Sequence, residues 1–244
     1  MAPKVLKDNC PSCQMLDTGY CKGCFTKDEY SIFKSLTDDE LDYLFEGKQQ
    51  IKYNTGETII KQNTSSTYVI CVKEGFAKVY IEGAAGKKII IKLIRRLDFV
   101  SGGGSVYGNV RKITISAITP VTCCVIDSSK LKKLFSENSQ FAVELLRHHT
   151  KYSNNLLEKL VNLTQKYMPG RVADTLLYLK NDIYNSKSFT IPLTRQDLAD
   201  MSNMTKESFV RILQEFKISE LIKVQRNTFT IIDEEGLTAI SKNG

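Results

Sequence analysis

The sequence predicts an α+β protein in which an N-terminal antiparallel β-barrel or jelly roll precedes a long helix and a C-terminal winged helix-turn-helix. Three patterns indicate this fold class. Short β-branched and aromatic runs recur from Ile51 to Ile126, apolar residues follow at helical spacing from Phe141, and two capped helical segments near the C-terminus precede two alternating runs. The expected parts are a cysteine-rich arm at 1–28, the barrel at 29–135, the long helix at 136–167 and the winged helix-turn-helix at 168–244.

The composition is that of an ordinary globular protein, with 42% hydrophobic and 25% charged residues among 244. No segment resembles a signal peptide or approaches the ~20 apolar residues that cross a bilayer. We therefore expect a cytoplasmic protein without a membrane partner, whose seven cysteines stay reduced. The net charge of +7 is weak evidence for a nucleic-acid partner, because residues 168–244 carry ten Lys and Arg against ten Asp and Glu.

The barrel region begins with a capped helix at 35–41 and continues as a β-meander. Glycines at 56, 75, 83 and 86 separate the β-rich runs, where tight turns require positive φ. The runs predicted as strands are ETIIKQ, TYVICVKE, FAKVYIE, KKIIIKLI, ITISAI and TCCVI.

The long helix carries an apolar stripe at positions 141, 145, 152, 156, 160, 163 and 167. Such a stripe fits a dimer seam, so we expect a dimerisation helix and a homodimer. The alternative is that the stripe packs on the protein's own barrel. His148 and His149 lie beside it and are expected to face solvent or to have partners rather than to bind a ligand. Met168-Pro169-Gly170 then interrupts the pattern and predicts a hinge.

The segment 194–217 has the pattern of a helix-turn-helix. Thr194 and Asp197 form a capping box for a helix with Leu198 and Met201 as its apolar positions, and Ala199 is small where two helices would cross. After a turn at 202–204, Thr205 caps a second helix. Its buried side is predicted to be Phe209, Ile212, Leu213 and Phe216, and its exposed side Lys206, Glu207, Val210, Arg211 and Gln214.

A helix presented in this way fits the major groove of DNA, where Arg pairs with guanine and Glu accepts a hydrogen bond from cytosine. Residues 221–224 and 228–232 alternate as strands around 225–227 and predict a two-stranded wing. The alternative is that Glu207 and Arg211 form only a surface ion pair on an ordinary helical hairpin. The order of β-domain, long helix, hinge, helix pair and wing favours DNA binding.

The segments RVADTLLYL, LTRQDLADMSNMTKESFVRILQEFK and LIKV resemble the C-terminal half of the CRP/FNR superfamily of bacterial transcription regulators, and the similarity extends from about Phe33 to Ile232. The resemblance implies a homodimer bound to two half-sites in double-stranded DNA, with RNA polymerase as a further partner if the protein is an activator. It implies that Glu207 and Arg211 read base edges, and that residues near Arg195, Thr205 and Lys206 contact phosphates. The expected DNA-binding residues are Arg195, Thr205, Lys206, Glu207, Ser208, Val210 and Arg211.

The cyclic-nucleotide signature of that family is broken in this chain. Family members hold the ligand with a Gly-Glu-Leu segment and an Arg-Ser/Thr-Ala segment, whereas Gly102 stands at about the glutamate position and Lys112 follows Arg111. Arg111 alone remains as a candidate effector-pocket residue, in reach of a phosphate. We therefore expect regulation that does not depend on cyclic AMP.

Two CxxC pairs, Cys10 with Cys13 and Cys21 with Cys24, are spaced so that four thiolates can converge on one metal centre. Zinc and an iron–sulfur cluster both fit, and the remaining alternative is that the four thiols are redox-active or merely retained. Oxygen-sensing members of the superfamily bind a [4Fe-4S] cluster with N-terminal cysteines and one barrel cysteine, and Cys124 stands where that last ligand would fall. The resemblance thus implies redox, oxygen or nitric oxide sensing, although the N-terminal spacing differs from that of those members. The cysteines at 71 and 123 are expected to be small buried core residues.

An enzymatic role is disfavoured. CxxC pairs of a thiol-redox enzyme are expected near a βαβ pattern, which the arm lacks, and no catalytic triad, carboxylate pair or cofactor loop is evident. A cyclic-nucleotide-binding scaffold that does not touch DNA is a second alternative, which the predicted wing and recognition helix oppose. The function that remains is a regulator in which a change at the barrel or arm reorients two DNA-reading heads.

Overall fold

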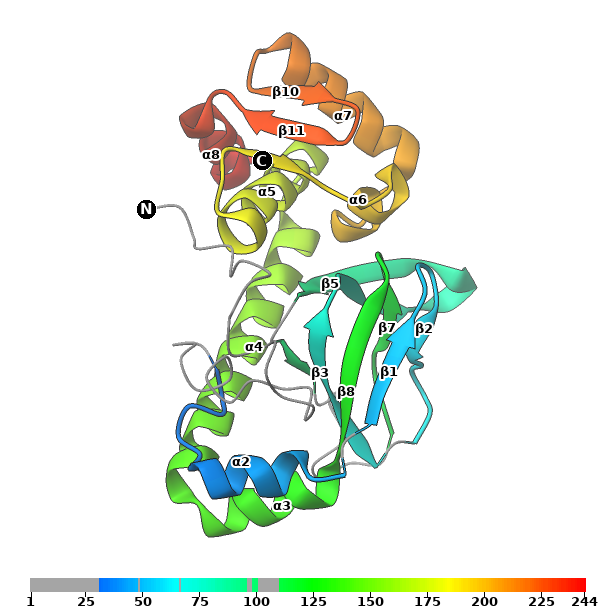
Figure 1. Ribbon diagram of the computed structural model, residues 1–244. Coiled ribbons are helices and arrows are strands. Elements are labelled where there is room, and N and C mark those ends of the chain that lie inside the picture. Colours follow the sequence, from blue (N-terminus) through cyan, green and yellow to red (C-terminus); the bar gives the residue numbers. More distant parts are fainter. Residues whose placement is uncertain (1–30, 48, 66, 96–97, 101–109) are drawn as a thin grey trace. The chain divides into compact units, whose positions relative to one another are not determined.

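The computed structural model describes residues 31–244 apart from 48, 66, 96–97 and 101–109 (Figure 1). The chain divides into two compact units. One contains Lys78–Leu93 and Asn155–Gly244, and the other contains the described residues up to Ala77 together with Ile94–Asn154. None of the helices in these ranges is both long enough and apolar enough to cross a membrane.

All six runs predicted as strands form strands, and the pairings whose register is defined are antiparallel. Together with two further strands, β1 and β6, they form two four-stranded sheets with the orders β1-β8-β3-β6 and β2-β7-β4-β5. Closure into a continuous barrel is not found among the described residues, so the jelly-roll version of the prediction fits. The strands are β1 (Gln49–Tyr53), β2 (Thr58–Ile60), β3 (Tyr68–Glu74), β4 (Ala77–Glu82), β5 (Lys88–Ile94), β6 (Phe99–Val100), β7 (Thr114–Ala117) and β8 (Val121–Asp127), with a short 3-10 turn, η2 (Ala84–Gly86), before β5.

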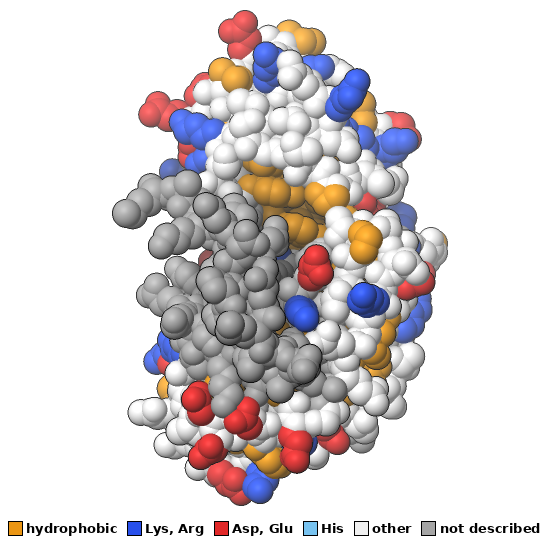
Figure 2. Space-filling view, viewed as in Figure 1, with side chains coloured by type: hydrophobic (Ala, Val, Ile, Leu, Met, Phe, Trp, Pro, Cys, Tyr) orange, Lys and Arg blue, Asp and Glu red, His pale blue; other side chains and the backbone are white. Residues whose placement is uncertain are grey.

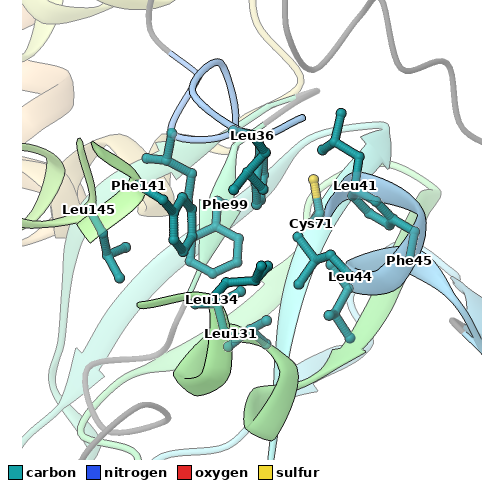
Figure 3. Close-up of a cluster of buried hydrophobic side chains, with 14 of the residues drawn as sticks. Leu36, Leu41, Leu44, Phe45, Cys71, Phe99, Leu131, Leu134, Phe141 and Leu145 are labelled. Carbon is teal, nitrogen blue, oxygen red and sulfur yellow. The ribbon is translucent and has the colours of Figure 1, made fainter. Parts of the chain in front are cut away.

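The helix predicted before the first strand is α2 (Asp38–Phe45). Thr37 and Glu40 cap its N-terminus reciprocally, which satisfies amide groups that have no partner inside the helix. Leu41, Leu44 and Phe45 point from α2 into a buried cluster with residues of β3, β6, β8 and the helices that follow (Figure 3). This cluster is the core of the N-terminal unit.

Two helices, not one, follow β8. α3 (Ser128–Glu137) is capped by Asp127, and α4 (Ser139–Gln165) begins after Asn138, whose extended backbone separates the two. The predicted apolar stripe on α4 is divided between two environments. Phe141 and Leu145 are buried in the core cluster, as the alternative interpretation expected, so these two residues are not part of a dimer seam (Figure 3).

The exposed apolar residues of α4 lie on a different face from Phe141 and Leu145. Each is 47–61% exposed, and their spacing includes the three- and four-residue steps of a heptad repeat. We refer to them as the α4 seam, which consists of Val143, Leu146, Leu157, Leu160 and Val161.

The chain after α4 forms four helices, a π-helical segment and a small sheet. Tyr167 stands at the N-cap position of α5 without a side-chain capping bond, and Pro169 lies in the first turn, where the missing amide proton costs nothing. The sheet has the order β10-β11-β9, so the predicted two-stranded wing gains a third strand. The elements are α5 (Met168–Tyr178), η3 (Leu179–Tyr184), β9 (Ser188–Thr190), α6 (Arg195–Met201), α7 (Lys206–Ile218), β10 (Ile222–Gln225), β11 (Thr228–Ile231) and α8 (Glu234–Asn243).

Candidate nucleic-acid interface

α6 and α7 form the predicted helix-turn-helix (Figure 1). The capping box of α6 is present, because the Asp197 amide donates to the Thr194 hydroxyl over 3.1 Å and the Thr194 amide donates back to the Asp197 carboxylate over 3.0 Å. Ala199 is fully buried, as expected of a small residue between crossing helices. In the turn, Asn203 adopts a left-handed φ of 50°, and the Met204 amide donates to the Ala199 carbonyl.

α7 separates its apolar and polar residues onto two faces. The four residues predicted to be buried are at most 4% exposed, which fixes the rotation of the helix about its axis. Lys206, Glu207 and Arg211 are exposed on the other face, and Val210 is half-buried beside them. The Thr205 hydroxyl accepts the Ser208 amide and donates to the Ser208 hydroxyl, so these two predicted contact residues also cap the helix.

Arg211 forms an ion pair with Glu215 over 2.6 Å, one turn further along α7. The alternative considered from the sequence was a pair with Glu207. Glu207 has no hydrogen bond or ion pair to any of the residues that the structure describes, and it lies in the first turn of α7. An exposed pair of this kind contributes about 0.3–0.5 kcal/mol, so Arg211 can exchange Glu215 for another partner at little cost.

Arg195 connects the start of α6 to the wing. Its guanidinium donates to the Arg226 carbonyl over 2.7 Å and lies 4.9 Å from the centre of the Phe229 ring, and burial lowers its pKa. A cavity of about 200 Å³ lies between α7 and the wing. Its lining includes three cationic side chains, and the residues are Arg195, Val210, Leu213, Gln214, Lys217, Val224 and Arg226.

Two cationic residues of this cavity, Lys217 and Arg226, were not among the residues expected from the sequence. Lys217 lies seven residues after Val210 and therefore on the same side of α7, which was a usable signal. Arg226 lies in the two-residue turn of the wing with φ of 54°, and only the packing of the wing on α7 brings it to the cavity. Around the C-terminal part, at the top of the space-filling view, acidic and basic side chains both occur, which agrees with the balanced charge of residues 168–244 (Figure 2).

Arg111 is 1% exposed in the N-terminal unit. Its guanidinium donates to the Tyr68 carbonyl and lies 5.8 Å from the centre of the Tyr68 ring, and burial lowers its pKa. Gly102, at the expected glutamate position, is outside the described residues.

The barrel cysteines are all buried. Cys71 and Cys124 are directly opposed on β3 and β8 and belong to the core cluster, while Cys123 is opposite Val72. Burial raises the pKa of Cys71 well above its ordinary value and that of Cys123 to about 12, so both behave as the small core residues that were expected.

Among the described residues, no group of three or more His, Cys, Asp or Glu side chains could hold a metal ion. Cys10, Cys13, Cys21 and Cys24 lie outside those residues.

A capped helix pair with an exposed polar face, supported by a wing, defines a DNA-binding protein of the winged helix-turn-helix class. Comparison with known proteins agrees. Residues 170–240 match the family model for a Crp-like helix-turn-helix domain, and residues 50–138 match that for a cyclic nucleotide-binding domain. The chain belongs to the CRP/FNR superfamily, and it is a DNA-binding transcription regulator rather than an enzyme.

Individual relatives are distant. The cAMP-activated global transcriptional regulator CRP of Salmonella typhimurium is 24% identical over 202 residues, which cover 81% of this chain and 96% of the relative. Electron transport regulator A of Shewanella oneidensis is 23% identical over 209 residues, 84% of this chain and 82% of the relative. The structure of FixK2 from Bradyrhizobium japonicum has a TM-score of 0.73 at 18% identity and covers 79% of this chain and 96% of that one.

Proposed function

We propose that the chain is a cytoplasmic, homodimeric regulator that reads two DNA half-sites about one helical turn, roughly 34 Å, apart and does so without cyclic AMP. The observation that carries the proposal is the two-faced α7, in which Glu207 and Arg211 are exposed while the opposite face is buried. These two side chains would read base edges. Arg195, Lys217 and Arg226 line the cavity beside them and would contact the phosphate backbone.

The α4 seam supports the homodimer. Leu157 is 61% exposed and Leu160 is 58% exposed, although both are large apolar side chains. Positions 143, 146, 150, 153, 157, 160 and 164 alternate steps of three and four along α4, and every residue at them is exposed. A second copy of α4 would cover this face as in a two-stranded coiled coil, with polar Thr150 and Ser153 near its middle.

The environment of Arg111 supports a response that does not depend on cyclic AMP. The guanidinium is engaged by the Tyr68 carbonyl and packed against the Tyr68 ring, so its role in the fold accounts for the residue without a phosphate ligand. The expected glutamate is replaced by Gly102. A small molecule of another kind acting on the barrel is the alternative effector. RNA polymerase would be a partner if the protein activates transcription.

We also propose that Cys10, Cys13, Cys21 and Cys24 bind a metal centre, either an iron–sulfur cluster or zinc. The paired spacing supports a site completed by the arm itself. Cys124 fits as a ligand less well, because it is 2% exposed and lies among apolar side chains of the core. An iron–sulfur centre would make the arm a redox, oxygen or nitric oxide sensor, whereas zinc would stabilise it.

The base-reading role is tested with two substitutions on one ion pair. A duplex is first selected by the wild-type chain from a randomised library, and affinities for it and for scrambled DNA are compared. Arg211→Ala should cost about 1–3 kcal/mol of specific binding, whereas Glu215→Ala, which frees the same guanidinium, should leave binding equal or tighter. Unchanged affinity of Arg211→Ala for the selected duplex would exclude Arg211 from base reading.

The metal proposal is tested by anaerobic purification, metal analysis and an absorption spectrum. The Cys13→Ser variant should lose the metal, and Cys124→Ala, the matched barrel variant, should keep it. Iron with labile sulfide identifies a cluster, and zinc alone identifies the structural alternative. A wild-type chain without metal, or a Cys13→Ser variant that retains the full amount, contradicts the proposal.

A further inference from the structure

Three consecutive residues, the last of α6 and the first two of the turn that follows it, each bond to a side chain from a supporting helix. The Met201 carbonyl accepts a hydrogen bond from Lys159 Nζ of α4 over 3.2 Å. The Ser202 hydroxyl pairs with the Thr175 hydroxyl of α5 over 2.8 Å, and the Asn203 carbonyl accepts from the Arg171 guanidinium of α5 over 3.0 Å. All of these residues belong to the C-terminal unit.

We infer that Lys159 is a positioning residue that connects the α4 helix to the DNA-reading head, so that the orientation of α4 sets the orientation of the head. Lys159 is the member of this set that comes from α4, while the other two anchors come from α5. Its bond ends on Met201, the last residue of α6, directly before the turn that leads into the recognition helix α7.

The ammonium of Lys159 loses favourable hydration in its position beside the Met201 carbonyl. Burial lowers its pKa to about 8, and the nearby Asp174 carboxylate opposes that change. At neutral pH the amine still carries its proton and can donate. Asp174 is itself engaged by Lys166 over 2.8 Å and by the Ser241 hydroxyl over 2.5 Å, so it is shared with the end of α4 and with α8. A buried ammonium of this kind stabilises a fold less well than an apolar side chain would, which favours a role in orientation.

This inference rests on the proposed dimer with two reading heads. Two heads can engage two half-sites only if both are held at the correct angle to the paired helices, whereas one head on one half-site has no such requirement. Loss of a positioning contact should therefore weaken binding to a full site and spare binding to a half-site. Loss of a base-reading contact should weaken both.

The experiment compares Lys159→Met, Lys159→Arg and Lys151→Met in the full chain, the last being an exposed lysine on the same helix. Affinities are measured at low salt for the library-selected duplex and for a duplex that retains one half-site. Lys159→Met should reduce the preference for two half-sites by about threefold to thirtyfold without weakening half-site binding. Lys159→Arg, which can still donate to the Met201 carbonyl, and Lys151→Met should keep the wild-type preference.

A Lys159→Met variant with the wild-type preference overturns the inference, and so does one that weakens both duplexes equally. A wild-type chain that shows no preference for two half-sites contradicts the proposed dimer instead. In that case amide hydrogen exchange tests whether the bond from Lys159 to the Met201 carbonyl holds the turn. The Ser202 and Met204 amides, bonded within the turn region, should exchange faster in Lys159→Met than in Lys159→Arg, and equal rates would show that Lys159 does not hold the turn.

Discussion

Gly75 occupies a position where no side chain can be accommodated. It has φ of +90°, and a Cβ built on it would overlap the carbonyl oxygen of Pro120. Gly56 has a similar φ of +88°, but a Cβ built on it would have no atom within 4 Å. Substituting each glycine by alanine therefore distinguishes two contributions to the loss of stability. Gly56 reports the cost of a left-handed backbone alone, and Gly75 reports that cost together with the steric overlap.

Gly75→Ala should lower the free energy of unfolding of the N-terminal unit by about 3 kcal/mol, because backbone strain of roughly 1–2 kcal/mol adds to the cost of moving the Pro120 segment. Gly56→Ala should lose only about 1–2 kcal/mol. Urea unfolding followed by circular dichroism measures both, since the chain has no tryptophan. Equal losses in the two variants would show that the Pro120 segment moves aside freely.

At the same scale, residue type and spacing were enough to place Glu207 and Arg211 on the exposed face of α7 but not to identify the partner of Arg211. Both Glu207 and Glu215 lie four residues from Arg211, and helical spacing treats the two as equivalent. The structure selects Glu215. This choice leaves Glu207 outside that ion pair, in the first turn of α7, where the proposed base-reading carboxylate would lie.

The elements of the C-terminal part were predictable because their signals are local. The capping residues Thr194 and Thr205 each stand at the N-cap of the helix expected of them, since a cap depends only on residues within one turn. The third strand of the wing, β9, was not predicted. It has three residues, pairs with a strand about forty residues away, and has too few positions to show an alternating pattern.

The long helix shows why an apolar stripe does not identify its own partner. Phe141 and Leu145 are as apolar as Leu157 and Leu160, and all four lie on one helix. Only the position of α2, α3 and β3 places the first pair inside the core cluster and leaves the second pair exposed. Hydrophobic periodicity identifies an apolar face of a helix, but it does not identify the surface that packs against that face.

At the scale of the whole molecule, the exposed part of that helix predicts the oligomeric state. Leu157→Lys should convert the dimer to a monomer of 27.6 kDa, because a charged side chain at a seam position has no partner across the interface. Glu158→Lys places the same side chain at the neighbouring exposed position outside the heptad core and should remain dimeric. Sedimentation equilibrium distinguishes the two. A dimeric Leu157→Lys variant, or a monomeric wild-type chain, would contradict the proposed seam.

The sequence by itself determined the fold class, the six predicted strands, the capped helix pair and the residues on each face of α7. These features depend on propensities, caps and periods that are written within a few turns of chain. Only the tertiary structure decided that the two sheets form without closure among the described residues, that Lys217 and Arg226 line the cavity between α7 and the wing, and that Lys159 reaches the last residue of α6. Those contacts join residues far apart in sequence, and the distance between two such residues follows from the packing of whole elements, which no local pattern specifies.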